Sequence, residues 1–443
     1  MKTFRKGGVH PHENKISSGR AIEVLPIPKT VSIPLSQVLG AAAVPVVEKG
    51  SKVLTGQLIA KGEAFISAHV HSSVSGTVTK IDEVLDSSGY KRKAIVIEVE
   101  GDEWDPSIDR SPELKKSISL GKDDIIKRIH DSGIVGLGGA TFPSHVKLMV
   151  PAGKKAEILL INGVECEPYL TSDHRVMMER GEEVLVGVTI LMKALDVKRA
   201  VIGIENNKAD AIEHLTKLSV QHPGIEVCAL KVKYPQGGEK QLIKAVTGRE
   251  VPSGKLPVDV NAVVHNVGTA LAVYEAVQKN KPLFERVVTV TGKSVKNPSN
   301  FLARVGVPVT LLIEQAGGLP EDTGKVINGG PMMGKALTTL EVPVVKGMSG
   351  IVIMTEKESR RFAVANCIRC GRCVTVCPMG LSPYLLAAAV DNGDLDLVEQ
   401  AKVMDCMECG CCHYTCPSGR PLLDQLRVGK SKVGQIIRSR KTN

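Results

Sequence analysis

The residues most able to do chemistry are eight cysteines arranged in two copies of one spacing. The first copy is Cys367, Cys370, Cys373 and Cys377 followed by Pro378, and the second is Cys406, Cys409, Cys412 and Cys416 followed by Pro417. Three thiolates two residues apart can wrap one cubane iron–sulfur cluster, while the proline-marked fourth leaves that loop for the other cluster. We therefore predict two [4Fe–4S] clusters, one held by Cys367, Cys370, Cys373 and Cys416 and the other by Cys377, Cys406, Cys409 and Cys412.

Zinc and disulfide bonds are the alternatives for these cysteines. A zinc site takes one set of four ligands and needs no fourth cysteine marked by proline. Disulfides require an oxidising compartment, and residues 1–8 lack the apolar run of a secretory signal. The spacing therefore favours clusters. Cys411 is surplus to the pattern, and we expect it to be a packing thiol.

The insert between the two cysteine motifs predicts helices. Ser382-Pro383 is typical of a helix start, and Asn392-Gly393 of a helix end. Asp394 can cap a second helix that runs to Ala401. We therefore expect the clusters to lie in a helical, ferredoxin-like domain over residues 358–426.

Composition limits the class of protein. A chain of 443 residues suggests three or four domains. Nine of its eleven cysteines lie in the last quarter, which indicates clusters and a reducing cytoplasm. The net charge of +10 favours an acidic protein partner or an anionic membrane surface. Nucleic acid is not expected, because the basic residues are scattered and few aromatics lie among them.

No segment predicts a membrane span. Residues 30–47 are uncharged, but Pro34, Pro45 and several polar side chains make them unsuitable for crossing a bilayer. Any attachment to a membrane is therefore expected through partner subunits.

A turn-rich arm (residues 1–22) precedes a small all-β unit over residues 23–101, whose short β segments are broken by Gly and Pro. Its centre resembles the hairpin of biotinyl and lipoyl carrier domains, with Ile66 where a carrier holds its modified lysine. The resemblance implies a barrel-sandwich fold without a swinging arm. His69 and His71 alternate on one strand and could be ligands, but surface or hydrogen-bonded histidines are the favoured interpretation.

After a polar linker, residues 120–282 have the pattern of an α/β domain. Residues 158–161, 200–204 and 227–232 are apolar runs of buried-strand length. Residues 183–195 and 208–218, which lie between them, have helical periodicity. This alternation predicts a doubly wound parallel sheet, in which ligands bind at the carboxyl ends of the strands.

A glycine-rich loop lies just ahead of this predicted sheet. Gly133, Gly136, Gly138 and Gly139 let the backbone approach a phosphate, and Lys147 adds positive charge. Such a loop also fits a tight turn, and it does not follow a strand as the usual dinucleotide fingerprint requires.

The loop is similar to the flavin and NADH loop of the flavoprotein subunit of respiratory complex I. Residues 162–168 (Asn-Gly-Val-Glu-Cys-Glu-Pro), 234–239 (Tyr-Pro-Gln-Gly-Gly-Glu) and 264–269 (Val-His-Asn-Val-Gly-Thr) resemble three further segments of that family in the same order. The resemblance implies that FMN is held by Gly136, Gly138, Gly139, Lys147, Asn162, Tyr234, Gly237, Asn266 and Thr269. It also implies catalytic positions at Phe142, beside which NADH stacks, and at Glu165 and Glu239, which line its path.

Four residues depart from that family's pattern. Val164 replaces an Asp, Gly238 a Glu, His265 an Asn and Gly268 a Glu. These changes indicate different hydrogen bonds to the flavin and a lower affinity. For Glu165 and Glu239 the structural alternative is a pair of ordinary solvated carboxylates.

The remaining segments complete the predicted architecture of a multidomain α/β protein. Residues 283–345 resemble the small β-grasp module that follows the flavin domain in complex I, and we expect a spacer there. The basic tail, residues 427–443, has no core pattern between residues 430 and 441, so we expect it to fray or to lie on a partner.

The order of all these parts resembles that of the C subunit of the Rnf (Rsx) complex, a membrane-bound ferredoxin:NAD oxidoreductase, up to about residue 425. The resemblance implies a peripheral protein on the cytoplasmic face of the bacterial cell membrane that reacts with NAD(H) and passes electrons through FMN and two [4Fe–4S] clusters. Its partners would be other membrane and iron–sulfur subunits, and ferredoxin indirectly.

The chemistry agrees with this assignment, because nicotinamide moves two electrons as hydride, a cluster moves one, and a flavin can do both. Two alternatives remain. The cobalamin reductase of bacterial microcompartments shares the layout. The A subunit of the sodium-pumping NADH:quinone reductase is similar at its N-terminus, which leaves open a docking role without NADH chemistry.

Overall fold

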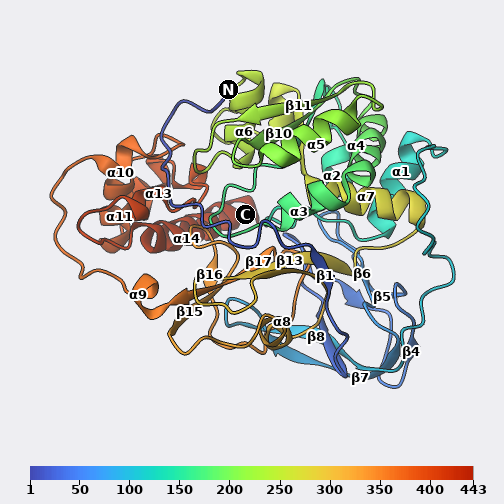
Figure 1. The fold of residues 1–443 in the computed structure, drawn as a ribbon. Coiled ribbons are helices and arrows are strands. Elements are labelled where there is room, and N and C mark those ends of the chain that lie inside the picture. The colour runs from blue at the N-terminus through green and yellow to red at the C-terminus, as the bar shows by residue number, and fades with distance from the viewer. Residues whose placement is uncertain (443) are drawn as a thin grey trace.

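The computed structural model describes residues 1–442 of the chain. Figure 1 shows an α/β layer above two groups of β-strands, with a helical part to one side. The fold is therefore a multidomain α/β fold, as the sequence predicts.

The α/β layer contains a four-stranded parallel sheet. Its order is β11 (Ile225–Leu230), β10 (Ala200–Glu205), β9 (Ile158–Asn162) and β12 (Ala262–Asn266). The helices of this layer are α1 (Lys122–Asp131), α2 (Ser144–Leu148), α3 (Ser172–Glu179), α4 (Gly181–Leu195), α5 (Ala209–Ser219), α6 (Glu239–Thr247) and α7 (Val267–Lys279). The predicted parallel sheet is confirmed. The reason is that its strands are buried, β-branched runs, while the apolar faces of α4 and α7 pack against them.

The N-terminal β unit is a barrel-sandwich of two small sheets. One sheet has the order β2 (Thr30–Pro34), β8 (Lys91–Val99), β7 (Gly76–Leu85) and β4 (Lys52–Val53). The other has the order β3 (Val44–Pro45), β5 (Leu58–Lys61) and β6 (Val70–His71). Ile66 lies in the bend between β5 and β6 and is 38% exposed.

A six-stranded mixed sheet follows the α/β layer. Its order is β1 (Ile22–Val24), β14 (Ser299–Arg304), β13 (Glu285–Thr291), β17 (Gly350–Thr355), β15 (Thr323–Asn328) and β16 (Lys335–Ala336), with α8 (Val309–Gln315) packed beside it. This sheet takes in strands on both sides of residues 283–345. Its buried side chains form one continuous core with those of the barrel, so the two β parts pack as a unit.

The cysteine-containing part is helical, as predicted. It holds α10 (Arg372–Thr375), α11 (Pro383–Asp391), α12 (Leu395–Gln400), α13 (Cys411–Tyr414) and α14 (Leu422–Thr442), and the short α9 (Glu356–Ser359) precedes it. Asp394 caps α12 by accepting a 3.0 Å hydrogen bond from Leu397 N. The side chain of Ser382 makes no capping bond to α11.

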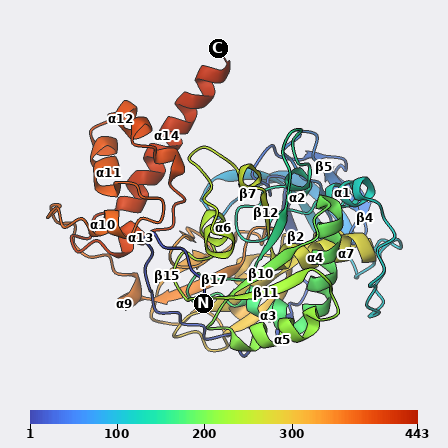
Figure 2. The same ribbon diagram turned by 90° about the horizontal axis from the view of Figure 1, so that it is seen from above.

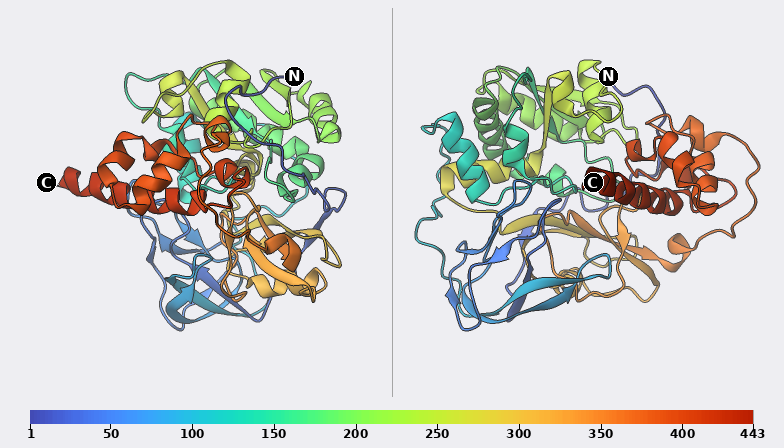
Figure 3. Two further views of the ribbon diagram at one scale, coloured as in Figure 1. Left: turned by 90° about the vertical axis from the view of Figure 1, so that its left-hand side faces the viewer. Right: turned by 180° about the vertical axis from the view of Figure 1, so that it is seen from behind.

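The prediction that residues 430–441 have no core pattern and fray is wrong. They belong to α14, whose Val433 is fully buried and whose Gly429 packs against Val390 and Val398. The small residue allows this close approach to α11 and α12, and a few apolar positions among many cations are enough to anchor the helix. Its distal end projects from the body of the molecule (Figures 2 and 3).

The N-terminal arm crosses the front of the molecule and joins three of its parts. Lys2 bridges to β11, Val9 exchanges two 2.9 Å backbone hydrogen bonds with Tyr234, and β1 completes the six-stranded sheet. Lys15 Nζ donates to the backbone oxygens of Glu165, Glu167 and Leu170 at 2.7–2.9 Å.

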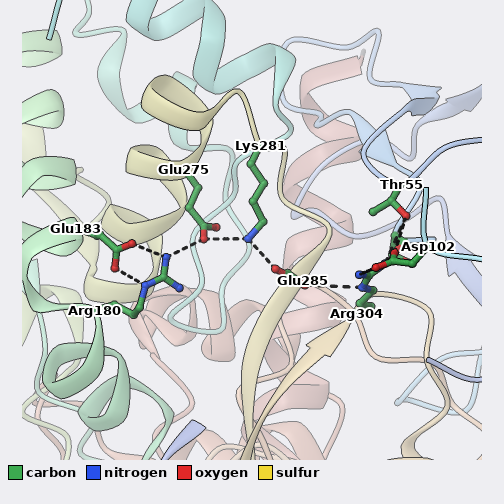
Figure 4. Close-up of polar contacts among 9 residues, drawn as sticks. Thr55, Asp102, Arg180, Glu183, Glu275, Lys281, Glu285 and Arg304 are labelled. Carbon is green, nitrogen blue, oxygen red and sulfur yellow. Dashed lines mark hydrogen bonds and ion pairs between the residues drawn. The ribbon is translucent and has the colours of Figure 1, made fainter. Parts of the chain in front are cut away.

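A ladder of alternating charges crosses the junction between the α/β layer and the β parts (Figure 4). It runs through Glu183, Arg180, Glu275, Lys281, Glu285, Arg304 and Asp102. Each interior group has a charge of opposite sign on both sides, which is the arrangement that offsets the cost of burying ions. Among the described residues, no helix is long and apolar enough to cross a membrane.

Candidate functional site

The glycine loop follows α1, not a strand, and lies at the carboxyl ends of β9 and β12. Gly136 N donates to Phe142 O at 2.9 Å, which closes the loop. Leu137 N donates to Thr269 Oγ1 at 2.9 Å, and the buried guanidinium of Arg286 donates to Leu137 O at 3.3 Å. These bonds hold the loop against the start of α7.

The outer face of the loop is open. Gly139 has a φ of +105°, and a Cβ added there would meet no atom within 4 Å. A Cβ at Gly138 would lie 3.5 Å from Cβ of Asn266, an ordinary contact, so its packing alone does not require glycine. Open space beside a bare backbone suits a ligand that approaches N–H groups closely, as the phosphate of FMN would.

Asn266, Thr269, Asn162 and Gly237 also meet at this edge of the sheet. Asn266 caps α7, since its Oδ1 accepts from Gly268 N at 2.8 Å and Thr269 N at 3.3 Å. Asn162 Nδ2 donates to Gly237 O at 2.8 Å. The structure thus brings together segments that are more than 100 residues apart in sequence.

Lys147 and Glu239 form an ion pair across the site. Lys147 Nζ donates to Glu239 Oε1 at 2.7 Å and to Val264 O at 3.1 Å. The neighbouring His265, one of the departures from the flavoprotein pattern, is buried, and its Nε2 has no partner among the described residues. Burial, and then the charge of Lys147, lowers the pKa of His265 to about 3, so the ring is neutral.

Two predicted site residues have structural partners of their own. Glu165, with a φ of +44°, places its carboxylate at the start of α3, where it accepts from Asp173 N at 2.8 Å. Tyr234 is 2% exposed, and its hydroxyl donates to Glu167 at 3.3 Å.

Sequence reasoning missed Glu167, Asp173 and Lys15. Glu167 accepts from Met332 N at 3.1 Å and Met333 N at 2.8 Å, so it ties the flavin-type loops to the β part. Burial raises its pKa to about 7. The Glu-Pro pair at residues 167–168 was a signal for Glu167, but nothing in the sequence indicated Lys15 or Asp173.

The cysteines form two groups. Burial, and then the charge of neighbouring thiolates, raises the pKa of Cys377, Cys406 and Cys412, and Cys409 is among the charges that act on all three. Burial, and then the charges of Cys367 and Cys370, raises the pKa of Cys373. The charge of Cys409 thus acts on Cys377, and Cys377 shares a buried cluster with Cys412 of the second motif.

Cys416 lies close to the chain that leads into the first motif. Two residues beyond it, Ser418 O accepts from Ala365 N at 2.9 Å. The donor set, eight thiols in two neighbouring groups, suits two cubane clusters. Cys411 is fully buried beside Val9 and Tyr234, as expected for a packing thiol.

The second cysteine group touches the flavin-type loops. A Cβ added at Gly238 would lie 2.5 Å from Cε of Met407, and Gln241 Nε2 donates to Met379 Sδ at 3.3 Å. Figure 2 shows α6, which begins at Glu239, on the side of the α/β layer that faces α13 and α14. Cys367 and Cys370, by contrast, are exposed.

A third cluster of titratable groups, His69, His130, His145 and Asp131, lies between the barrel and α1. The ring centroids of the first three stack edge-to-face at 4.5–4.6 Å. His69 Nδ1 accepts from Gly62 N at 3.1 Å, so in the neutral ring the hydrogen is on Nε2 and no lone pair there is free for a metal. This geometry favours the hydrogen-bonded interpretation of His69.

Four families match successive segments of the chain. Residues 2–102 match the RnfC barrel sandwich hybrid domain, and residues 129–275 match the Nuo51 FMN-binding domain. Residues 287–336 match the SLBB domain, and residues 359–417 match the 4Fe-4S dicluster domain.

Full-length relatives are also similar. The chain is 46% identical to the C subunit of the proton-translocating ferredoxin:NAD(+) oxidoreductase complex of Clostridium ljungdahlii, over 91% of this chain and 87% of that protein. It is 45% identical to the C subunit of the Na(+)-translocating ferredoxin:NAD(+) oxidoreductase complex of Acetobacterium woodii, over 99% and 98%. A NAD+-reducing [NiFe]-hydrogenase in the H2-reduced state aligns with a TM-score of 0.49 at 18% identity, over 70% of this chain and 63% of that one.

Proposed function

Because the chain belongs to the family formed by the C subunits of ion-translocating ferredoxin:NAD(+) oxidoreductase complexes, we propose that it exchanges electrons between NAD(H), a bound FMN and two [4Fe–4S] clusters. FMN, when bound, supplies the step between two-electron hydride transfer and one-electron transfer to a cluster.

One observation carries the proposal: the flavin-type loops and one cysteine group are in direct contact. Gly238 and Met407 approach each other there, and Tyr234 packs against Cys409. A cofactor beside Gly237 would therefore have the second cysteine group as its neighbour. The exposed first group is the exit toward a partner.

The residues of the site have distinct tasks in this proposal. The loop N–H groups and Lys147 bind the phosphate, and a charged donor of this kind contributes about 1.5–3 kcal/mol. Asn266 and Thr269 fix the loop against α7, so that its open face is held ready for the cofactor. NADH would enter beside Phe142 and Glu239, the positions that the resemblance to the complex I flavoprotein implies.

The contact between the flavin-type loops and the second cysteine group also supports a peripheral position of this chain in a larger complex. Electrons that leave through the exposed Cys367 group need an acceptor outside this chain. We propose that this electron-transfer partner belongs to the other membrane and iron–sulfur subunits of the complex, and that ferredoxin exchanges electrons with it indirectly. The protein would then lie on the cytoplasmic face of the bacterial cell membrane.

Reconstitution tests the function. The full chain is loaded with clusters and FMN, NADH is added anaerobically, and flavin bleaching and cluster EPR signals are followed together. We expect the flavin to bleach and the electrons to appear on the clusters. Loss of EPR signal from a Cys409→Ser variant, with bleaching retained, would assign the first acceptor to the second cysteine group.

Two outcomes would replace the proposal. FMN that binds but is not bleached by NADH would favour a docking role without NADH chemistry. Reduction of a corrinoid by NADH through this chain, without any membrane partner, would favour a cobalamin reductase.

A further inference from the structure

Two carboxylates lie together directly behind the residues proposed to contact FMN. Glu165 Oε1 accepts from Asp173 N at 2.8 Å and from Ser172 Oγ at 3.2 Å, and its Oε2 accepts from His174 N at 3.2 Å. Asp173 Oδ2 accepts a 2.6 Å hydrogen bond from Asn266 Nδ2. Asn266 therefore connects Asp173 to the cofactor face of the site.

The two carboxylates are not equivalent. Glu165 sits at the start of α3, where backbone N–H groups and the helix dipole stabilise a negative charge. Asp173 has one strong donor, Asn266, and stands beside the charge of Glu165. A proton added to the pair is therefore expected on Asp173.

Water can reach Asp173. It lines a cavity of about 60 Å³ together with Leu137, Gly268 and Arg286. Arg180, Glu275 and Glu285 line the same cavity, and the side chain of Arg180 is 33% exposed. Asp173 therefore shares a cavity with three members of the charged ladder of Figure 4, and one of them, Arg180, is partly exposed to solvent.

Burial, and then the charge of Glu165, raises the pKa of Asp173 to about 7. The cations that face it are Arg286 of β13 and Lys208, which precedes α5, and both charges oppose the rise. His174 is directed away, since its Nε2 pairs with Asp210 at 2.9 Å. Near neutral pH a small change in local charge therefore alters how much of Asp173 is protonated.

We propose that the Glu165–Asp173 pair takes up one proton from solvent when the neighbouring cofactor site gains negative charge on reduction, and releases that proton on reoxidation. This inference rests on the proposed function. No bond to the cofactor is made or broken by the pair: one proton leaves water and binds a carboxylate oxygen, while the electrons come from the clusters or from NADH. Asp173 is a positioning residue that acts through charge, behind Asn266.

A redox titration tests the pair. The reconstituted chain is titrated electrochemically with mediators from pH 6 to pH 8, and the flavin absorbance is followed after subtraction of an FMN-free sample. One extra proton per two electrons adds 29.6 mV per pH unit to the slope of the midpoint potential. We expect Asp173→Asn to lose that increment over part of this range and to bind up to one proton fewer per flavin reduced, most clearly above pH 7, in weakly buffered dye solution.

Asp210→Asn is the matched control, because Asp210 belongs to the same neighbourhood but pairs with His174 at the surface. It should keep the wild-type slope. Equal slopes in wild type and Asp173→Asn would overturn the inference. If Asp173→Asn does not fold, Glu165→Gln supplies the second variant: removal of the Glu165 charge should move the steep part of the slope to lower pH, and an unmoved slope would again overturn it.

The titration uses electrodes instead of NADH, so it separates the two proposals. A flavin that NADH cannot reduce would remove the proposed function and leave the proton linkage measurable. A flavin that NADH reduces with the same proton count in both proteins would remove only the linkage.

Discussion

Lys147 and Glu239, both predicted from sequence to belong to the cofactor site, bond to each other at 2.7 Å. The lysine that is expected to meet the phosphate is thus already neutralised by a carboxylate at the start of α6. Binding of an anion would have to compete with that partner, so we expect the ion pair to lower the affinity of the site for FMN.

Removal of Lys147 and removal of the Glu239 charge should change FMN affinity in opposite directions. Lys147→Ala loses a charge-assisted contact of about 1.5–3 kcal/mol, so we expect FMN to bind one to two decades more weakly. Glu239→Gln frees the lysine from a pair worth about 0.2–1 kcal/mol, so binding should tighten by no more than about fivefold. Quenching of FMN fluorescence measures both. Lys240→Ala, which changes the neighbour of Glu239 on α6, is the control and should leave the FMN affinity unchanged.

Gly138→Ala separates ligand approach from folding. Its backbone is not in the left-handed region, and the added Cβ would make only ordinary contacts, so the melting temperature of the FMN-free chain should stay within about 1 °C. The methyl group would face the cofactor, so FMN affinity should fall, and more steeply in Gly138→Val. Gly19→Ala, with no atom within 4 Å of its Cβ, is the control. Unchanged affinity in Gly138→Val would remove the loop from the site.

Crossed ligation predicts which cluster each proline-marked cysteine supports. Cys416→Ala should damage the cluster held by Cys367, Cys370 and Cys373, and Cys377→Ala the other one. Wild type should contain about eight irons per chain on anaerobic analysis, which follows from two four-iron clusters. EPR spectra in which Cys416→Ala loses only the signal of the second cysteine group would contradict the assignment.

Lys346 should make stability depend on pH. Its ammonium is 1% exposed and donates to His69 O and Gly133 O at 2.8 Å, and burial lowers its pKa to about 7. Since the unfolded chain keeps this proton up to about pH 10, folding becomes more favourable as pH rises above 7. The gain is at most about 1.4 kcal/mol per pH unit. The difference in melting temperature between wild type and Lys346→Met should therefore change between pH 7 and pH 9 in favour of wild type.

The barrel should carry no prosthetic group. Ile66 occupies the bend between β5 and β6 where a carrier domain would present its lysine. Mass spectrometry of protein from its native host should find neither biotin nor lipoate in residues 24–100, Lys61 included. A modified lysine in this range would overturn the structural interpretation of the barrel.

The parts predictable from sequence were those whose signals are local. The strands β9, β10 and β11 are runs rich in apolar, β-branched residues. The helix α11 ends just before Asn392-Gly393, two residues with low helix propensity. The cysteine spacing likewise records local loop geometry. Burial and packing of the helix α14 depend on Gly429 meeting Val390, which no local pattern reports.

The remaining parts of the site depend on contacts between distant segments. Lys15 bonds to three carbonyls some 150 residues away, and Asp173, in the first turn of α3, meets Asn266 at the end of β12. A lysine in a turn-rich arm and an aspartate in the first turn of a helix are ordinary in sequence. Only the fold gives each a buried partner.

The arm has a further consequence for how the chain is made. Residues 1–22 are synthesised before their partners Glu165, Tyr234, Asn300 and Val376. Docking of the arm is therefore complete only when the cysteine segment has reached its place beside Gly7. A truncated product lacking the cysteine segment would keep the contacts of Lys2, Lys15 and β1 and lose those of Gly7 and Gly8 with that segment.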